Sequence, residues 1–573
     1  MPTGEAQNPT PFLSLQTGRR FTGWRSNKTC PRYGAQATDD GRLEIELDKR
    51  IPRVPKLVHA LEKEPPSTPP NKNKQDVIHF QLKLNVVIQV VGSRGDVQPL
   101  IVLGKALQGH GHRVRLATHL TFRDFVKNNG LEFFNIGGDP SELMSFMVKN
   151  PSMTPKMRNV LDGTITRRRK ELRAIIGGCW RSCIETGEGY DIASGDTFNV
   201  NTAPFIADAI IANPPSFAHI HCAEKLGIPL HMMFTMPWSP SRAFPHPLAN
   251  IHSSSIEPST ANFASYVIME LLIWQGLGDM VNDFRRFELG LNALNDVSGS
   301  ILIDQLQIPF TYLWSPTLLS KPDDWQQHIE VAGFNFLPDK DDYDPPRDLV
   351  NFLEAGDPPV YIGFGSIIVG NPDNLTQLIL DAVQLTGQRA IISKGWGGLG
   401  GEKISQPNVF FCGNVPHHWL FERVSCVVHH GGAGTTATGL ALGLPTVIVP
   451  FFGDQPFWGS LVAKNGAGPE PIWHKDLDAD GLAKAIEFCL QPSTIKNAQE
   501  LCRRIQAEDG AQAALESFHR QLDPGKIQCS LCPDRPAVWR VRGTEIVLSA
   551  FAAAVLIQEK KLTTKQMKLE VAR

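Results

Sequence analysis

Short apolar segments alternate with segments of helical length in two separate parts of the chain. The apolar segments are residues 84–91, 113–119, 131–137, 208–214 and 228–237 in the first part, and residues 359–366, 389–395, 408–413, 426–432 and 446–452 in the second. Apolar runs such as LNVVIQVV are typical of parallel strands that are buried on both faces. Such strands are joined by right-handed helical crossovers. The chain is therefore expected to be an α/β protein with two doubly wound, Rossmann-like lobes that face a central cleft.

The segments outside these two runs predict the domain organisation. Residues 64–76, EPPSTPPNKNKQD, have a composition that cannot bury enough apolar surface to fold, so residues 1–80 are expected to be a mostly disordered extension. Within it, residues 41–51 alternate in polarity and could form a strand or add to a sheet edge. The other expected units are an amino-terminal lobe at 81–325, a linker at 326–350, a carboxyl-terminal lobe at 351–525 and an extension at 526–573.

Composition excludes several classes of function. The formal net charge of −2 gives no basic field that would attract nucleic acid. The apolar stretch at 546–557 is shorter than the ~20 residues that span a bilayer, and the amino terminus lacks the pattern of a secretion signal, so a cytoplasmic protein is expected. The 10 cysteines are scattered, and only CSLC at 529–532 has metal-like spacing. Since structural zinc needs four ligands, no metal site is expected.

A glycine-rich turn follows the strand predicted at 426–430. The sequence HHGGAGTT places His429 and His430 at the end of that strand, directly before a helix. The unpaired N–H groups and the dipole at a helix start favour an anion such as phosphate, and glycines let the anion approach the backbone. The alternative is a tight turn that only needs small residues. Asp454 and Gln455 end the next strand, where a carboxylate and an amide suit sugar hydroxyls. Phosphates beside hydroxyls suggest a nucleotide sugar.

Residues 429–459 resemble the donor-binding signature of GT-B glycosyltransferases, and in particular of the sterol 3-β-glucosyltransferase group. They also resemble the bacterial glycosyltransferases that modify glycopeptide antibiotics. The resemblance extends to YIGFGSI at 361–367 and NVPHHWLF at 414–421, and it covers about residues 84–490. It implies the GT-B fold, with an acceptor-binding amino-terminal lobe and a carboxyl-terminal lobe that binds UDP-glucose.

The resemblance also implies which residues contact the donor. His429 is the implied diphosphate contact, with His430 as the second choice, and Asp454 and Gln455 hold the glucosyl hydroxyls. The remaining implied contacts are Ser366, Gly431, Gly432, Gly434 and Thr435 near the phosphates, and Val415, Pro416 and His417 near the uracil. His417 and His418 could equally be plain surface-loop residues. Thr435 and Thr436 could instead cap the helix.

The loop GSRGDVQP at 92–99 follows the first predicted strand. A carboxylate at the carboxyl end of that strand can take a proton from an acceptor hydroxyl. By resemblance this base is Asp96, and Ser93 and Arg94 belong to the same acceptor-side loop, with ordinary loop chemistry as the alternative. Helix ends and N–H groups would stabilise the donor phosphates, so the mechanism requires neither a metal nor a cofactor beyond the co-substrate UDP-glucose.

The sequence constrains the identity of the acceptor less than that of the donor. Residues 232–250 and 264–281 are aromatic and apolar, and the second segment is either an ordinary core face or one wall of a pocket for a rigid, lipid-like alcohol. We expect an inverting transfer of glucose to a sterol or similar lipophilic alcohol, with peripheral membrane contact left open. The alternatives are a glycosyltransferase of specialised metabolism that acts on a terpenoid, a non-catalytic scaffold that binds lipid or nucleotide sugar, and an interaction protein that uses either terminus. The apolar face of 529–562 predicts packing on a neighbour or a partner.

Overall fold

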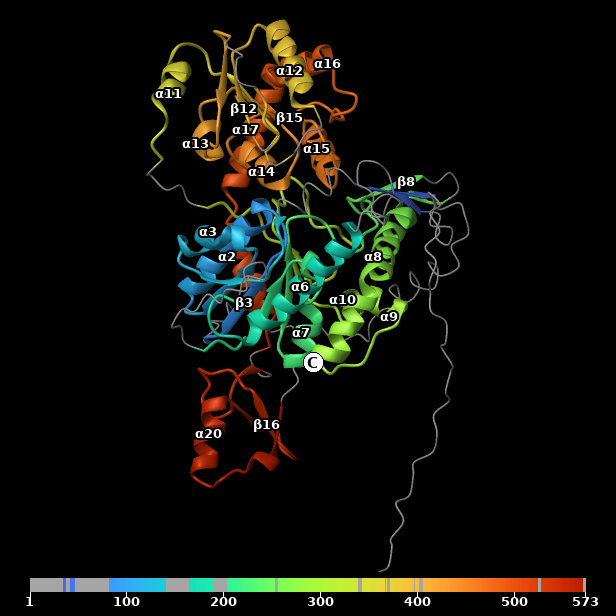
Figure 1. The fold of residues 1–573 in the computed structure, drawn as a ribbon, viewed down its shortest axis with the longest axis vertical. Helices are drawn as coiled ribbons and strands as arrows, with labels where there is room; N and C mark the ends of the chain where they lie inside the picture. The colour runs from blue at the N-terminus through green and yellow to red at the C-terminus, as the bar shows by residue number, and fades with distance from the viewer. Residues whose placement is uncertain are drawn as a thin grey trace, which may run out of the picture.

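The protein has two lobes and a small carboxyl-terminal module. Figure 1 shows a computed structural model in which the lobes are stacked along the long axis, with the module at the far end of the amino-terminal lobe. The described residues are 35–37, 42–46, 82–140, 164–189, 204–252, 256–337, 343–365, 367, 371–395, 397–400, 406–523 and 527–569. Most of the extension predicted at 1–80 therefore lies outside the described residues.

The amino-terminal lobe is built on a seven-stranded parallel sheet with the order β10-β9-β7-β6-β3-β4-β5. Its strands are β3 (Asn85–Gln89), β4 (Arg113–Thr118), β5 (Glu132–Asn135), β6 (Ala209–Ala212), β7 (Leu230–Phe234), β9 (Phe310–Tyr312) and β10 (Ile329–Val331). The five apolar segments of the first run are all strands. The sequence analysis missed β9 and β10, because three residues are too few to show a periodicity.

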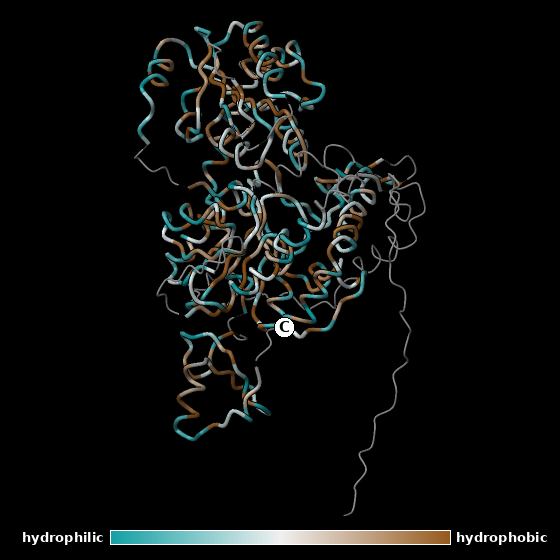
Figure 2. The backbone as a smooth tube through the Cα atoms, in the orientation of Figure 1, coloured by the Kyte–Doolittle hydropathy of each residue, from teal (hydrophilic) through white to brown (hydrophobic). Residues whose placement is uncertain are grey.

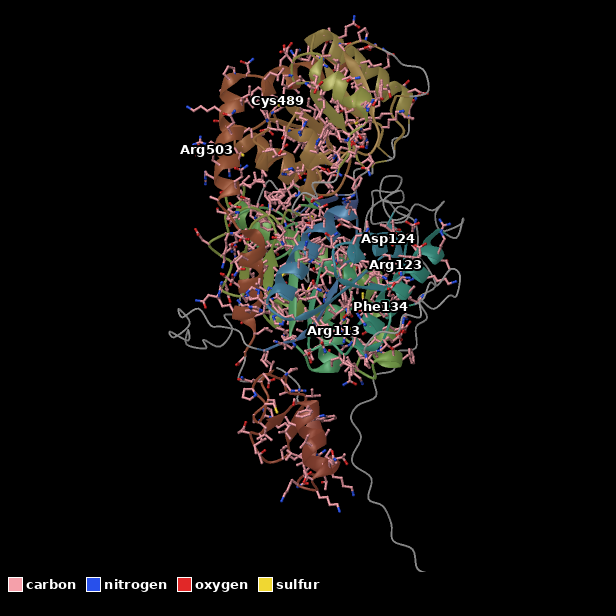
Figure 3. The ribbon with its side chains drawn as sticks, turned by 90° about the vertical axis from the view of Figure 1, so that its left-hand side faces the viewer. Arg113, Arg123, Asp124, Phe134, Cys489 and Arg503 are labelled. Atoms are coloured by element: carbon pink, nitrogen blue, oxygen red, sulfur yellow. The ribbon has the colours of Figure 1, made fainter. Side chains whose placement is uncertain are left out.

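Helices cover both faces of this sheet. Val86 and Ile88 of β3 pack with the buried side of α2, whereas Val87 packs with α6, because successive strand residues point to opposite faces. The helical segments of the lobe are α2 (Arg94–Gly109), η1 (Leu120–Phe122), α3 (Arg123–Lys127), α6 (Thr164–Ile184), η2 (Pro214–Ser216), α7 (His219–Leu226), α8 (Pro258–Asp283), η3 (Phe284–Glu288), α9 (Asp296–Ser300) and α10 (Leu302–Gln305). Figure 3 places Arg113, Arg123 and Phe134 in this lobe, below Cys489 and Arg503 of the other lobe.

The carboxyl-terminal lobe has a five-stranded parallel sheet with the order β13-β12-β11-β14-β15. Its strands are β11 (Val360–Gly363), β12 (Ala390–Ser393), β13 (Val409–Cys412), β14 (Cys426–His429) and β15 (Thr446–Ile448). Its helices are α11 (Arg347–Glu354), α12 (Pro372–Thr386), α13 (His417–Phe421), α14 (Ala433–Ala441), α15 (Gln455–Lys464), α16 (Ala479–Cys489) and α17 (Pro492–Gln506). The strands are apolar and lie in the interior of both lobes (Figure 2). This agrees with the predicted second run.

Helix α18 (Gly510–Gln521) crosses from the second lobe back to the first. Ala514, Leu515 and Phe518 of this helix pack in the same core as the buried residues of α2. The predicted domain boundary at residue 525 placed α18 in the carboxyl-terminal lobe, whereas in the structure α18 packs in the core of the amino-terminal lobe. The reason is that the apolar stripe of α18 matches the apolar side of the first lobe, so burial there satisfies it.

The amino-terminal extension contributes two strands. Strand β2 (Leu43–Glu46) pairs in parallel with β8 (Ala249–His252), and β1 (Ala35–Ala37) pairs with the other edge of β2. Residues 41–51 therefore contain the strand that the alternating pattern predicted. In Figure 1 these strands lie beside β8, at the end of α8 nearest the carboxyl-terminal lobe.

The carboxyl-terminal module folds around its own core. Its strands β16 (Trp539–Val541), β17 (Val547–Leu548) and β18 (Met567–Leu569) form an antiparallel sheet beside α20 (Ala550–Gln558), with η4 (Thr564–Gln566) before β18. Leu548, Ala552, Ala553 and Met567 form its buried cluster. The apolar face that was expected to pack on a neighbour or a partner is thus partly buried within the module. None of the described helices combines the length and apolarity needed to cross a membrane.

One helix glycine allows a test of the packing. A Cβ at Gly178 of α6 would lie 2.3 Å from the carbonyl oxygen of Ile136, a backbone atom that cannot move aside. Gly178→Ala is therefore expected to destabilise the protein by about 1–3 kcal/mol and to lower its thermal unfolding midpoint. The matched control is Gly177→Ala, because the added Cβ would meet only the ends of two flexible side chains, Arg181 at 3.3 Å and Glu288 at 3.7 Å. Equal midpoints for the two variants would contradict this packing.

Candidate active site

Asp96 belongs to the first turn of α2 rather than to a loop. The loop was predicted to extend over residues 92–99, but the helix begins at Arg94 because Ser93 and Asp96 form a capping box. Oδ2 of Asp96 accepts hydrogen bonds from the Ser93 backbone N–H at 2.8 Å and from the Ser93 hydroxyl at 3.2 Å. Both bonds use the same oxygen. The orientation of the carboxylate is therefore fixed while Oδ1 stays available to take a proton.

Gly92 and His119 shape the loop that leads to this helix. Gly92 has a φ of +146°, and a Cβ there would lie 2.3 Å from Oδ2 of Asp96, so only glycine fits. The Gly92 N–H donates to Nε2 of His119 at 3.3 Å, and Nδ1 of His119 bonds to the Gly137 carbonyl at 2.8 Å. Burial lowers the pKa of His119, which keeps the ring neutral. Sequence reasoning missed His119, although its place after β4 at the same sheet edge is a signal.

Asp96 faces a second carboxylate across the cleft. Withdrawal from solvent raises the pKa of Asp96 to about 6, and the negative charge of Asp454 on the other lobe adds to the shift. Burial also raises the pKa of Asp454. A carboxylate with a pKa in this range is suited to act as a general base near neutral pH.

His429 is the last residue of β14, and one of its two ring nitrogens is hydrogen-bonded within the described part of the chain. Nδ1 accepts from the Gly431 N–H at 3.0 Å, so the proton of the neutral ring is on Nε2. Burial lowers the pKa of His429 well below its ordinary value and keeps the ring neutral. None of the described residues offers an acceptor to this buried Nε2. Because an unpaired buried donor costs about 1–3 kcal/mol, the position suits a ligand oxygen.

His430 also brings an unpaired atom to this turn. Its buried Nδ1 has no hydrogen-bond partner within the described part of the chain. The ring lies against the neighbouring strand end, since a Cβ at Gly365 would be 3.3 Å from its Cε1. The structure thus brings both histidines to the turn. Ser366, the predicted phosphate contact next to Gly365, lies outside the described residues.

The glycines of the turn keep the backbone open, and at Gly431 a close approach requires glycine. A Cβ at Gly431, where φ is +88°, would lie 2.6 Å from Cγ2 of Ile448. Gly432 is the N-cap of α14 and supplies no side-chain cap, so the first N–H groups of the helix remain available for an anion. A Cβ at Gly434 would lie 3.8 Å from the Cα of Gly95, the second residue of α2. The amino termini of α2 and α14 therefore meet across the cleft.

Neither threonine caps α14. Thr436 is buried and its hydroxyl donates to the Gly432 carbonyl at 3.0 Å. Thr435 is partly exposed at the helix start, and no hydrogen bond of its hydroxyl to the described residues is seen. The capping interpretation is wrong for both residues, and Thr435 stays a predicted phosphate contact.

Asp454 and Gln455 are held by their own helix and strand. Oδ2 of Asp454 accepts from Nε1 of Trp458 at 2.7 Å. Oε1 of Gln455 accepts from the N–H groups of Phe451 and Phe452 at 2.7 and 3.1 Å. These bonds leave one carboxylate oxygen as an acceptor and the amide NH2 group as a donor. That pair of groups matches vicinal hydroxyls on a sugar.

The segment predicted to lie near the uracil packs tightly. The Val415 side chain is buried with Leu420 and Phe421, so only its backbone can reach a ligand. His417 stacks on Phe421 at 4.7 Å between ring centroids and lies 3.2 Å from the Tyr361 hydroxyl, so a plain surface-loop role is wrong for it. Burial, with a smaller effect of Arg94, lowers the pKa of His417 to about 4. His418 is more exposed and lies 3.8 Å from Glu422.

Arg94 lies at the same junction from the other lobe. Its guanidinium lies over the Phe125 ring, 4.6 Å from the centroid, and its charge reaches His417.

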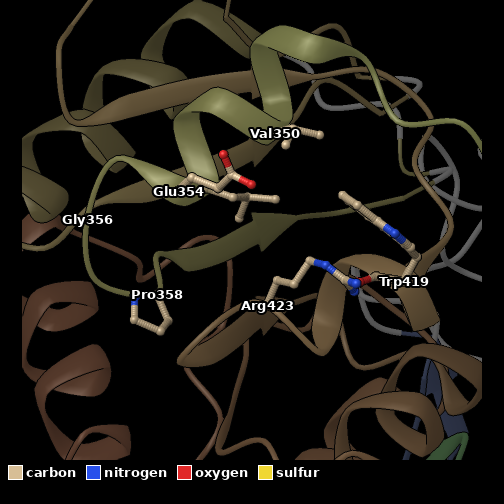
Figure 4. Close-up of a pocket in the computed structure, with 7 residues that line it drawn as sticks. Val350, Glu354, Gly356, Pro358, Trp419 and Arg423 are labelled. Carbon is tan, nitrogen blue, oxygen red and sulfur yellow. The ribbon is translucent and has the colours of Figure 1, made fainter.

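A separate pocket of about 260 Å³ lies between α11 and α13 (Figure 4). Its lining residues are Val350, Leu353, Glu354, Gly356, Pro358, Trp419 and Arg423. None of them is a predicted site residue, so this pocket is not the candidate active site. The described residues contain no cluster that could hold a metal ion.

Two family models match the chain. Residues 86–188 match the glycosyltransferase family 28 N-terminal domain, and residues 401–514 match the erythromycin biosynthesis protein CIII-like C-terminal domain. Sterol 3-beta-glucosyltransferase UGT80B1 of Arabidopsis thaliana is 44% identical over 446 residues, which cover 77% of this chain and 69% of that protein. For UGT80A2 of the same organism the identity is 46% over 447 residues, with coverages of 78% and 67%. The solved glycotransferase of kitacinnamycin is similar in fold, with a TM-score of 0.54 and 18% identity over 77% of this chain and 100% of that chain.

The unpaired nitrogen of His429 gives a prediction for nucleotide binding. His429→Asn keeps an acceptor for the Gly431 N–H but removes the donor at the Nε2 position. We expect its dissociation constant for UDP, measured by titration calorimetry, to rise about 10- to 100-fold, since a hydrogen bond to a charged group contributes about 1.5–3 kcal/mol. His429→Gln places a donor near the original Nε2 and serves as the control. Equal, wild-type affinities in both variants would contradict the assignment.

Proposed function

Because the chain belongs to the sterol 3-beta-glucosyltransferase family, we propose that it transfers glucose from UDP-glucose to the 3β hydroxyl of a sterol. The chain is a glycosyltransferase with the GT-B fold. The observation that carries the donor assignment is the buried, unpaired Nε2 of His429 beside the uncapped start of α14. A diphosphate would satisfy both features at once.

The proposed reaction is a single displacement that inverts the anomeric carbon. Oδ1 of Asp96 takes the proton of the acceptor hydroxyl as the acceptor oxygen attacks that carbon. The bond between the sugar and the β-phosphate oxygen breaks, and UDP leaves with the bonding electron pair. Nε2 of His429 and the N–H groups of α14 stabilise the charge on UDP, while Asp454 and Gln455 hold the sugar hydroxyls.

The acceptor is proposed to lie along the segment before β8. Phe244 contacts Phe457 of the other lobe at 5.6 Å between ring centroids, and a Cβ at Gly453 would be 3.9 Å from Leu248. These partly buried apolar side chains pack, with Trp238, against the same hydrophobic core. For residues 264–281 the core-face interpretation holds, because Ala264, Val267, Ile268 and Leu271 are buried in a cluster.

We also propose that the enzyme works in the cytoplasm at membrane surfaces. Sterols partition into bilayers, whereas a nucleotide sugar is water-soluble, so transfer between them requires peripheral contact with a membrane.

The direct test of function is mass spectrometry of the protein incubated with UDP-glucose and several alcohols. A panel of ergosterol, cholesterol and terpenoid alcohols distinguishes the candidate acceptors. We expect one hexose on the sterols. Transfer to a terpenoid alone would move the protein to specialised metabolism. Binding of UDP without any transfer would favour a non-catalytic scaffold.

The raised pKa of Asp96 predicts the pH dependence of the reaction. The base must be ionised, so kcat/KM for the sterol is expected to be level above pH 6 and to fall about tenfold per pH unit below the pKa of about 6. His417 and His430 stay neutral through this range because burial lowers the pKa of each to about 4.

Asp454→Asn tests the cause of that pKa. Removing the facing charge is expected to lower the pKa of Asp96, which moves the acid limb to lower pH whatever the absolute rate. An acid limb at the same pH in both proteins would show that Asp454 does not influence the titrating group.

A further inference from the structure

Strand β8 in the acceptor lobe depends on the amino-terminal extension for its pairing. In the three-stranded sheet β1-β2-β8, the one described strand that pairs with β8 is β2. The register joins Leu43 to Ala249 and Glu46 to His252, so β2 covers the full length of β8. Arg42 also donates to the Ala249 carbonyl at 3.0 Å. Without residues 42–46 the backbone groups of β8 would lose this ladder.

The side chain of Ile45 anchors β2 to the body of the lobe. Ile45 is 0% exposed and packs in a cluster with Ala249 and with Ala264, Val267 and Ile268 of α8. Burying a whole isoleucine side chain is a large stabilising contribution for a five-residue segment. The extension is thus part of the lobe at this point.

Strand β8 in turn fixes the position of residues 244–248, which form a wall facing the donor loop, the loop that carries Asp454. The Ala249 N–H donates to the His246 carbonyl at 2.8 Å, and the Leu248 N–H donates to Nδ1 of His246 at 3.1 Å. Leu248 directly precedes β8 and lies against Gly453, the residue before Asp454. A displacement of β8 would therefore move an apolar side chain beside the sugar-binding carboxylate.

From this chain of contacts we infer that β2 is a positioning element for the acceptor: by pairing with β8 and burying Ile45 it holds the 244–248 wall against the donor loop. Strand β2 pairs with β1 and β8, whereas the diphosphate-binding turn belongs to β14 and α14 of the other lobe. Loss of β2 should therefore impair use of the acceptor and spare nucleotide binding. The identity of the acceptor as a sterol rests on the proposed function.

The experiment compares two truncations of the chain. Removal of residues 1–33 keeps β1 and β2, whereas removal of residues 1–48 deletes both. We expect the longer truncation to lower kcat/KM for the sterol by about 10- to 100-fold, since small misplacements near the reacting groups have effects of this size. The dissociation constant for UDP should be unchanged in both, and the shorter truncation should match the full chain.

A synthetic peptide of residues 33–48 provides the readout that a merely structural loss would not give. Added to the longer truncation, it should restore sterol kinetics and slow amide hydrogen exchange in residues 244–252, because an added strand can pair with an open sheet edge. The same peptide with Ile45→Asp should do neither. Hydrogen exchange and UDP binding require no sterol, so they still test β2 if the acceptor proves to be another alcohol.

Two results would overturn the inference. One is full sterol kinetics and unchanged exchange in residues 244–252 after removal of residues 1–48. If that truncation does not fold, Ile45→Ala in the full chain replaces it. For this variant, a rise in the Michaelis constant for the sterol with unchanged UDP affinity supports the inference. The second result that would overturn it is an equal loss of affinity for the sterol and for UDP.

Discussion

The meeting of two helix amino termini, one from each lobe, is the constraint on which the site depends. Gly434 at the start of α14 approaches Gly95 at the start of α2, where a Cβ would be 3.8 Å from the neighbouring backbone. Each helix follows a parallel strand, so both starts lie at carboxyl sheet edges, where ligands of such sheets bind. This approach brings Asp96 opposite Asp454 and the phosphate-binding turn next to both.

The electrostatics of the cleft follow from that approach. Withdrawal from water raises the pKa of both carboxylates, and the charge of Asp454 adds to the rise for Asp96, which suits Asp96 to base chemistry near neutral pH. The histidines around them are kept neutral by burial, so they act as hydrogen-bond donors and acceptors rather than as cations. In the proposed site, a diphosphate anion would be bound by backbone N–H groups and by Nε2 of His429, which need no proton uptake. Trp458 ties Asp454 to the aromatic core that includes Trp314 of the first lobe.

Much of the architecture could be predicted because buried parallel strands have a strong sequence signal. The apolar runs at 84–91 and 426–432 became β3 and β14, and the glycine-rich turn and the Asp-Gln pair lie where the strand ends indicated. The three-residue strand β9 gave no such signal. Asp96 was predicted to lie in a loop but lies in α2, because the capping box of Ser93 and Asp96 starts the helix at Arg94. His119 and Ile45 act through contacts with residues distant in the chain, which a single sequence does not reveal.

The central claim is that Asp96 is the base, and the kinetics of Asp96→Asn test it most directly. The amide keeps an acceptor for the Ser93 N–H and preserves the capping box in shape, but it cannot take a proton. We expect kcat/KM for the sterol to fall roughly 10²- to 10⁴-fold while the dissociation constant for UDP is unchanged. Near-normal transfer with intact UDP binding would contradict it.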